Sequence, residues 1–115
     1  MNTRGDARNL AKDISGRSIC RVRVGAVLSD DYGIFKWAWN HPGPNCEGAH
    51  AEAEALKRVN RKRLQGAKIT VAAFRNGKMI LARPCEAICL PRLKKCGVKT
   101  MEYGTKEGVW KSELI

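Results

Sequence analysis

The C-terminal end of the chain most constrains its topology, because its last two predicted strands lie very close together in the sequence. Residues 98–103 and 109–114 are predicted as strands, and only Gly104-Thr105-Lys106-Glu107-Gly108 connects them. A crossover between parallel strands needs a dozen or more residues. The two strands must therefore pair as an antiparallel hairpin.

Upstream of this hairpin, helical and extended patterns alternate along the chain. Apolar residues spaced four apart predict a helix over 3–15, and alternating apolar and charged residues predict a strand over 18–28. The remaining predicted elements are strands over 34–39 and 67–75, an extended segment over 79–82, and helices over 50–64 and 85–96. This order predicts one α/β domain over residues 1–115, a three-layer α/β/α arrangement around a mixed five-stranded sheet.

The charge of the chain indicates a polyanionic partner. Lysine and arginine total 22 against 11 acidic residues, which gives a formal net charge of +11. Such a surface attracts nucleic acid above all. No apolar run is long enough to span a membrane, and the N-terminus lacks the apolar stretch of a signal peptide. With five cysteines, an odd number that disfavours a disulfide framework, we expect a cytoplasmic protein.

Two short motifs carry the residue types of a metal centre. His50-Ala51-Glu52 lies at the start of one predicted helix, and Pro84-Cys85-Glu86-Ala87-Ile88-Cys89 lies at the start of another. Zn²⁺ binds imidazole nitrogen and thiolate sulfur, and a catalytic zinc keeps one position for a water whose pKa falls to about 7. We predict that His50, Cys85 and Cys89 bind zinc. Glu52 is then placed to move the proton of that water.

These residues resemble the signature H-x-E…P-C-x-x-C of zinc deaminases that act on nucleobases, except that three residues separate Cys85 from Cys89. Residues four apart still share one face of a regular helix. Both motifs would lie at helix N-termini, which favour thiolate. A closed structural zinc site remains an alternative, with Cys46 or Cys96 as its fourth ligand.

From about residue 18 onward, the chain resembles the zinc-dependent cytidine deaminase-like superfamily. The resemblance implies that the His and the two Cys hold zinc and that Glu52 transfers a proton from water to the base. The segment from Gly33 to Glu52, with Trp37-Ala38-Trp39-Asn40 followed by His50-Ala51-Glu52, also looks like the bacterial tRNA adenosine deaminases. In those enzymes an Asn after the second strand contacts the sugar of the target nucleotide, and Asn40 matches that place.

The C-terminal hairpin distinguishes the branches of this superfamily. The tRNA adenosine deaminases and the vertebrate polynucleotide cytosine deaminases have parallel final strands with a helix between them, for which this chain has no room. The match is closest to the bacterial toxin-type and phage-encoded deaminases, several of which deaminate cytosine in DNA. Free cytidine deaminases share the hairpin, but they usually have Cys in place of His50 and lack the positive charge.

Several residues near the motifs are candidates for substrate contacts. Trp39 and His41 flank the predicted pocket loop and could stack on a base. Arg83 could contact a phosphate, and the backbone N–H of Ala51 could stabilise the transition state. Further candidates are the aromatic residues Trp37, Phe74 and Trp110, of which the first two fit the core better, and the basic residues Arg21, Arg23, Lys36, Arg75 and Lys78.

Three functions remain open at this point. The leading hypothesis is a zinc-dependent hydrolytic deaminase that converts cytosine to uracil in single-stranded DNA. The alternatives are a deaminase of free cytidine or deoxycytidylate, and a non-catalytic zinc module that binds nucleic acid. The start at Met1 suggests a stand-alone intracellular enzyme of phage or bacterial origin. The sequence leaves the base, DNA against RNA, the flanking-sequence preference and the oligomeric state open.

Overall fold

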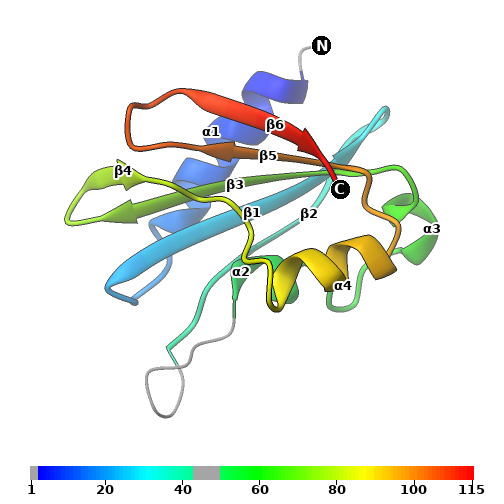
Figure 1. Ribbon diagram of the computed structural model, residues 1–115, viewed down its shortest axis with the longest axis horizontal. Coiled ribbons are helices and arrows are strands. Elements are labelled where there is room, and N and C mark those ends of the chain that lie inside the picture. Colours follow the sequence, from blue (N-terminus) through cyan, green and yellow to red (C-terminus); the bar gives the residue numbers. More distant parts are fainter. Residues whose placement is uncertain (1–2, 43–49) are drawn as a thin grey trace.

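The computed structural model describes residues 3–42 and 50–115, and in it a mixed sheet forms the centre of the molecule (Figure 1). Its strands are β1 (Val22–Asp30), β2 (Gly33–Trp39), β3 (Lys68–Arg75), β4 (Lys78–Ile80), β5 (Thr100–Gly104) and β6 (Trp110–Leu114). The strand order is β2-β1-β3-β5-β6, and β4 pairs with β3. The segment predicted only as extended is thus a sixth strand, so the prediction of five strands is wrong by one.

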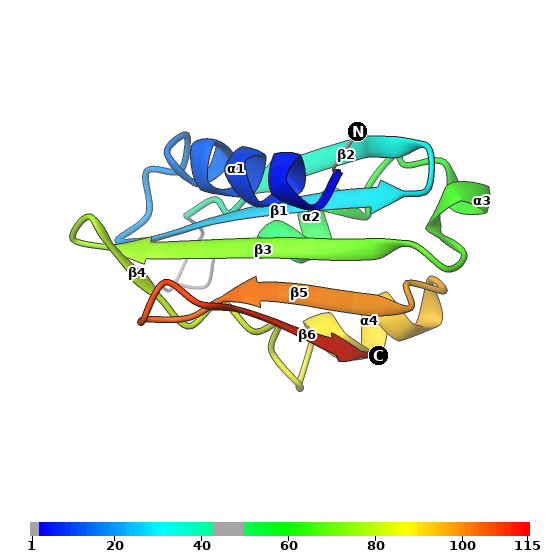
Figure 2. The ribbon, with the colours of Figure 1, turned by 90° about the horizontal axis from the view of Figure 1, so that it is seen from above.

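The predicted hairpin at the C-terminus is confirmed. β5 and β6 pair antiparallel from Thr100 opposite Leu114 to Gly104 opposite Trp110. β3 and β5 pair in parallel, which the long connection between them allows. Every other pairing in the sheet is antiparallel, so the sheet is mixed as predicted (Figure 2).

Helices cover both faces of the sheet, as the alternating pattern predicts. α1 (Thr3–Ser15) lies behind the sheet in Figure 1 and packs on the face that includes Val27. The other face, which includes Ala26 and Leu28, packs against residues of the remaining helices. These helices are α2 (Ala51–Ala55), α3 (Arg61–Leu64) and α4 (Cys89–Lys95).

The predicted long helix over 50–64 is wrong, because the chain breaks it into α2 and α3. Arg58 lies between them with a φ of 52°, in the left-handed region that ends a helix. Asn60 then caps α3, since its side chain accepts a hydrogen bond from the N–H of Lys62. The predicted helix over 85–96 also starts late, at Cys89, because residues 86–88 form a turn.

α1 approaches β1 closely because Gly25 has no side chain. A Cβ atom at this position would lie 2.2 Å from the carbonyl oxygen of Ala11 and 2.7 Å from the nitrogen of Ser15. Ala7 and Ala11 are fully buried in the same contact. Small residues on both elements therefore bring the helix backbone onto the strand.

We expect Gly25→Ala to lower the free energy of unfolding by about 3 kcal/mol, because the atoms in the way belong to a helix backbone that cannot rotate aside. Urea denaturation followed by circular dichroism measures the loss. Gly16→Ala is the matched control, since its Cβ would meet only one atom, at 3.2 Å. If Gly25→Ala were as stable as that control, the close approach of α1 to β1 would not require a glycine at this position.

A buried ion cluster joins α1 to the sheet. Glu102 of β5 is fully buried, and its Oε2 lies 2.7 Å from Nη2 of Arg8. Its Oε1 lies 3.6 Å from Nζ of Lys68 and accepts a hydrogen bond of 3.4 Å from Oγ1 of Thr70. The guanidinium of Arg8 also lies over the ring of Trp110. A negative charge in the interior is thereby matched by two cations.

Candidate metal centre and active site

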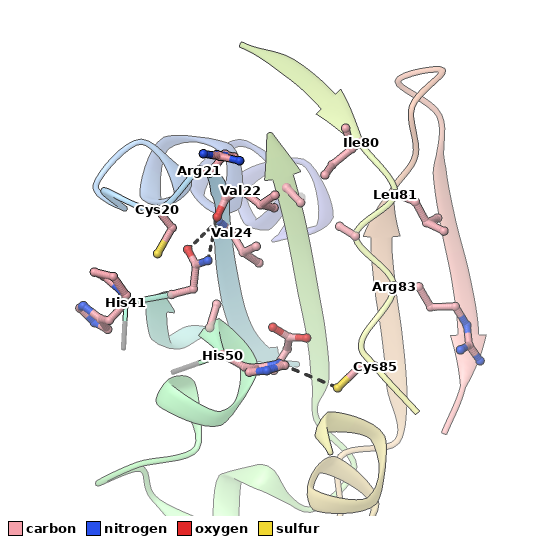
Figure 3. Close-up of a pocket in the computed structure, with 16 residues that line it drawn as sticks. Cys20, Arg21, Val22, Val24, His41, His50, Ile80, Leu81, Arg83 and Cys85 are labelled. Atoms are coloured by element: carbon pink, nitrogen blue, oxygen red, sulfur yellow. Dashed lines mark hydrogen bonds between the residues drawn. The ribbon is translucent and has the colours of Figure 1, made fainter. Parts of the chain in front are cut away.

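The structure brings the three predicted zinc ligands together from distant parts of the chain. His50 directly precedes α2, Cys85 follows β4, and Cys89 is the first residue of α4. Nδ1 of His50 lies 3.3 Å from Sγ of Cys89. It lies 3.8 Å from Sγ of Cys85 (Figure 3). All three donor atoms lie within 4.8 Å of one another.

Both the distances and the donor types of this group fit a zinc ion. Nitrogen and sulfur ligands of one tetrahedral zinc lie about 3.6 Å apart when the metal–ligand bonds have their usual lengths. Cys89 is buried and Cys85 half-buried, while His50 is exposed, so one side of the group faces solvent. Three ligands with an open side are typical of catalytic rather than structural zinc.

The alternative of a closed site with Cys96 as the fourth ligand does not fit the structure. Cys96 caps the far end of α4 and packs against the hydrophobic core. Within residues 3–42 and 50–115, the metal-binding group contains three side chains and Cys96 is not one of them. Cys46, the other candidate, lies outside the described residues.

The extra residue between the cysteines changes how the first of them is held. Cys85 lies outside α4, so the expectation that both cysteines share one face of a regular helix is wrong. Its Sγ instead accepts a hydrogen bond of 3.3 Å from the N–H of Cys89, and its carbonyl accepts one of 2.9 Å from the N–H of Leu90. A turn over 86–88 thus takes up the added residue and still leaves the two thiols side by side.

Glu52 has the environment of an acid–base group. It lies on α2, two residues after His50, and only 6 % of its surface is exposed. Burial raises the pKa of its carboxyl group, while hydrogen bonds from its own N–H and from Cys89 act in the opposite direction. Burial, followed by the charge of Glu52, raises the pKa of the Cys89 thiol. A cation at this point would stabilise the ionised forms of both groups.

A cavity of about 710 Å³ opens beside these residues (Figure 3). Its wall includes His50, Glu52 and Cys85, so two of the three metal-binding side chains and the acid line the same cavity. Of the predicted substrate contacts, Asn40, His41, Ala51 and Arg83 also line it, but Trp39 does not. Cys20, two residues before β1, and Leu81, directly after β4, also line the cavity; they were not predicted because neither belongs to a motif.

Asn40 is held firmly in the cavity wall. Its Nδ2 donates a hydrogen bond of 2.8 Å to the carbonyl of Val22, and its Oδ1 accepts one of 2.9 Å from the N–H of Val24. The side chain thereby extends the pairing of β1 with β2. One amide hydrogen and one lone pair remain for a ligand such as a sugar hydroxyl.

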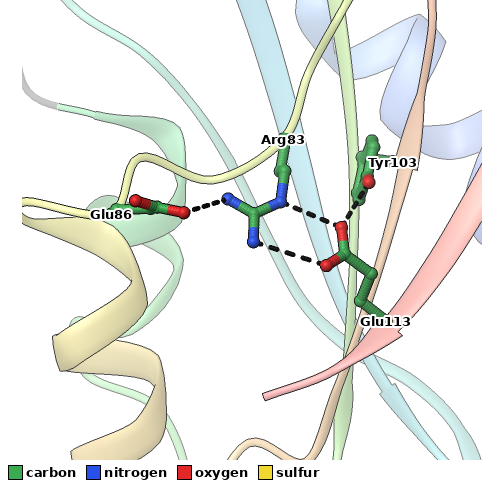
Figure 4. A network of polar contacts seen from close by, with 4 residues as sticks. All are labelled: Arg83, Glu86, Tyr103 and Glu113. Atoms are coloured by element: carbon green, nitrogen blue, oxygen red, sulfur yellow. Dashed lines mark hydrogen bonds and ion pairs between the residues drawn. The ribbon is translucent and has the colours of Figure 1, made fainter.

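Arg83 has protein partners where a phosphate contact is predicted. Its Nε donates to Glu113 at 2.9 Å, and its Nη1 donates to Glu86 at 3.1 Å (Figure 4). The guanidinium therefore serves two carboxylates of the chain. In this arrangement its charge is already neutralised, which leaves little attraction for a phosphate.

The aromatic candidates lie mostly on the wrong face of the sheet. Phe74 and Trp110 pack in the core under α1, opposite the cavity. Trp39 pairs across the ladder with Gly25, the strand residue nearest α1, and its ring lies under Arg17. Trp37 is 46 % exposed, so its predicted place in the core is wrong. Of the predicted stacking candidates within the described residues, only His41 lines the cavity, and its ring centroid lies 5.5 Å from that of Trp39.

The fold and the site together define a zinc-dependent deaminase. Residues 3–105 match the model of the cytidine and deoxycytidylate deaminase zinc-binding region, and the chain belongs to this family. Zinc is therefore its cofactor, and the hypothesis of a non-catalytic zinc module does not hold. Within the described part of the chain, no helix has the length and apolar character to cross a membrane.

Solved structures share this fold at low sequence identity. Cytidine deaminase from Burkholderia pseudomallei is 21% identical, with a TM-score of 0.72 over 96% of this chain and 91% of that chain. The apo dCMP deaminase from cyanophage S-TIM5 is 19% identical, with a TM-score of 0.64 over 88% of this chain and 81% of that chain. RibD from Acinetobacter baumannii is 24% identical with a TM-score of 0.59; the match covers 88% of this chain and 26% of that one. No curated protein matches the sequence.

Proposed function

We propose that the protein converts cytosine to uracil in single-stranded DNA, with His50, Cys85 and Cys89 as the zinc ligands. Bound zinc would supply a water that is deprotonated near neutral pH. Glu52 accepts one proton of that water and delivers it to N3 of the ring, while the oxygen adds to C4. Glu52 then takes the proton of the new C4 hydroxyl and delivers it to the amine as the C4–N bond breaks. Water and cytosine thus give uracil and ammonia, and the carboxylate is regenerated.

The remaining residues of the cavity bind and orient the nucleotide. Ala51 lines the cavity as the first residue of α2, and its backbone N–H would donate a hydrogen bond to the base. Asn40, fixed by its bonds to β1, offers its free amide hydrogen to the sugar. His41 supplies the ring on which the base stacks. The volume of the cavity is in the range of sites for ligands larger than a free base.

One observation favours a polymer over a free nucleotide: basic residues without acidic partners lie at one rim of the cavity. Arg21 is exposed and lines the cavity. Arg75 is exposed and pairs across the ladder with Val22, the neighbour of Arg21, and exposed Lys78 pairs with Arg75. None of the three cations has an ion pair with a described carboxylate. Such a row of cations can bind successive phosphates of a nucleic-acid chain, whereas a mononucleotide carries only one phosphate group.

Single-stranded nucleic acid is favoured over a duplex for a physical reason. The target base must leave its stack to enter the cavity, and the cost is lowest when it is not already paired. A free nucleoside or nucleotide is the second candidate, because the Burkholderia cytidine deaminase and the cyanophage dCMP deaminase have the same fold. The predicted similarity to toxin-type and phage-encoded deaminases supports the first candidate and remains a prediction.

The test compares substrates that differ only in the phosphate chain. Oligonucleotides with one cytosine, as single-stranded DNA, duplex or RNA, are incubated beside dCMP and cytidine, and uracil is measured in each; adenine versions report on the base. We expect single-stranded DNA to exceed dCMP in kcat/KM by at least about 100-fold, since each phosphate contact adds affinity. A higher kcat/KM for dCMP or cytidine would favour the second candidate, and inosine without uracil would exclude cytosine as the target.

Added salt should weaken the binding of the oligonucleotide, and the slope of log K against log salt should report the number of phosphate contacts. Three phosphate contacts predict about a 20-fold loss of affinity between 50 and 200 mM salt. The double variant Arg75→Ala/Lys78→Ala should reduce the slope of log K against log salt by about 1.4. The matched control Lys94→Ala/Lys95→Ala, at the end of α4, should leave it unchanged. Equal slopes in the two variants would contradict the assignment of this rim.

A further inference from the structure

Arg83 ties the turn that carries Cys85 to the last strand of the sheet. Its Nε lies 2.9 Å from Oε2 of Glu113 on β6, and its Nη2 lies 3.4 Å from Oε1 of the same carboxylate (Figure 4). Its Nη1 reaches back to Glu86, the residue after Cys85, at 3.1 Å. The guanidinium therefore binds the turn on both sides of this cysteine and connects it to an element 30 residues away in the sequence.

The carboxylate at the centre of this network is itself well held. The hydroxyl of Tyr103, a buried residue of β5, donates a hydrogen bond to Glu113. Arg83 holds the pKa of Glu113 below its usual value, so the pair is ionised at neutral pH. A planar guanidinium that meets a carboxylate with two nitrogens is more rigid than a pair formed by a lysine.

Cys85 needs such support because the local structure restrains it weakly. The added residue places it ahead of α4, in a segment from 81 to 88 without helix or strand. When only two residues separate the two cysteines, the first turn of a helix can fix both thiols. Here the helix fixes Cys89, whereas Cys85 is restrained locally by two hydrogen bonds, at its sulfur and at its carbonyl. Its distance from His50 therefore depends on contacts outside the helix.

We propose that Arg83 and Glu113 form a clamp that positions Cys85 for zinc binding and compensates for the extra residue between the two cysteines. Arg83 is thus a positioning residue and does not touch the substrate. A ligand that is held in place before the ion arrives loses less conformational freedom on binding, and residues around a metal site typically change its affinity 10–100-fold. The clamp rests on the proposed assignment of Cys85 as a ligand.

The test measures zinc affinity by competition with a chromogenic chelator, in Glu113→Gln, Arg83→Gln and the double variant. We expect each single variant to bind zinc about tenfold more weakly, and the double variant to be no weaker than either one, because both break the same unit. Arg83→Lys retains the positive charge but cannot bind the carboxylate with two nitrogens. Its zinc affinity should therefore lie between those of wild type and Arg83→Gln. Glu107→Gln, in the exposed β5–β6 turn, is the matched control with unchanged affinity.

Two further measurements distinguish the clamp from a general loss of stability and from a wrong ligand assignment. Thermal unfolding of the zinc-free variants shows whether they fold; a merely structural role would lower their Tm and leave zinc affinity within twofold of wild type, and that result would overturn the clamp. Losses that multiply in the double variant would also overturn it. Cys85→Ser is assayed beside them: unchanged zinc affinity there would instead remove the ligand assignment, and the clamp with it.

Discussion

Glu52→Gln should reduce kcat by about 10³-fold while the protein keeps its full complement of zinc, since a positioned acid–base group contributes 10²–10⁴-fold. Glutamine has the size of glutamate and can fill the same buried position on α2. It cannot, however, accept a proton from water and return it to the base. The loss should therefore fall on kcat, with little change in KM.

The measurement combines steady-state kinetics on the cytosine oligonucleotide with zinc analysis of the same sample. Glu54→Gln is the matched control, because Glu54 lies on the same helix but pairs with Lys57 at its surface. It should remain within about twofold of wild-type activity, as expected for a surface position. If Glu52→Gln retained full zinc and more than a tenth of the activity, Glu52 would not be the proton-transfer group.

Glu102→Gln should lower the free energy of unfolding by about 3–5 kcal/mol, the usual loss when one partner of a buried ion pair is removed. Glu102 is fully buried between α1 and β3, where Arg8 and Lys68 approach its two oxygens. Glutamine has nearly the same shape, so the core keeps its packing. The two cations then remain near the interior without their counter-charge, which is the source of the loss.

Guanidinium denaturation, followed by tryptophan fluorescence, measures this change. Glu107→Gln serves as the reference, because the same substitution at an exposed position should change stability by less than about 0.5 kcal/mol. A loss below about 1 kcal/mol at Glu102 would mean that water reaches the cluster, since exposed pairs contribute no more than this. The size of the effect thus reports how tightly α1 closes this face of the sheet.

The two predictions concern opposite faces of one sheet. The face with α2 and α4 carries the metal-binding group, while the face under α1 contains the ion cluster and the aromatic residues Phe74 and Trp110. The strand β3 belongs to both, with Val71 on one side and Ala72 on the other. A substitution that weakens the packing of α1 should therefore lower the free energy of unfolding. Activity should fall only in proportion to the fraction of folded protein.

Much of the fold could be predicted from local sequence patterns. The helix α1, the hairpin β1–β2 and the C-terminal hairpin all follow from apolar spacing and short connections. The break between α2 and α3 could not be predicted, because the positive φ at Arg58 does not change the spacing of the apolar residues. The late start of α4 was missed for a similar reason: residues 85–88 are compatible with a helix but are held in another form by hydrogen bonds to Cys85.

The sequence by itself determined the chemistry of this protein: one imidazole, two thiols and a carboxylate, in two motifs that match a zinc deaminase. Side-chain types and their spacing are local properties, and they can be read without a fold. The tertiary structure decided which residues surround them: Arg83 binds Glu113 instead of a phosphate, and Trp39 lies under Arg17 and does not line the cavity. Such partners are set by sheet pairing, which joins segments far apart in the chain, so no local pattern contains them.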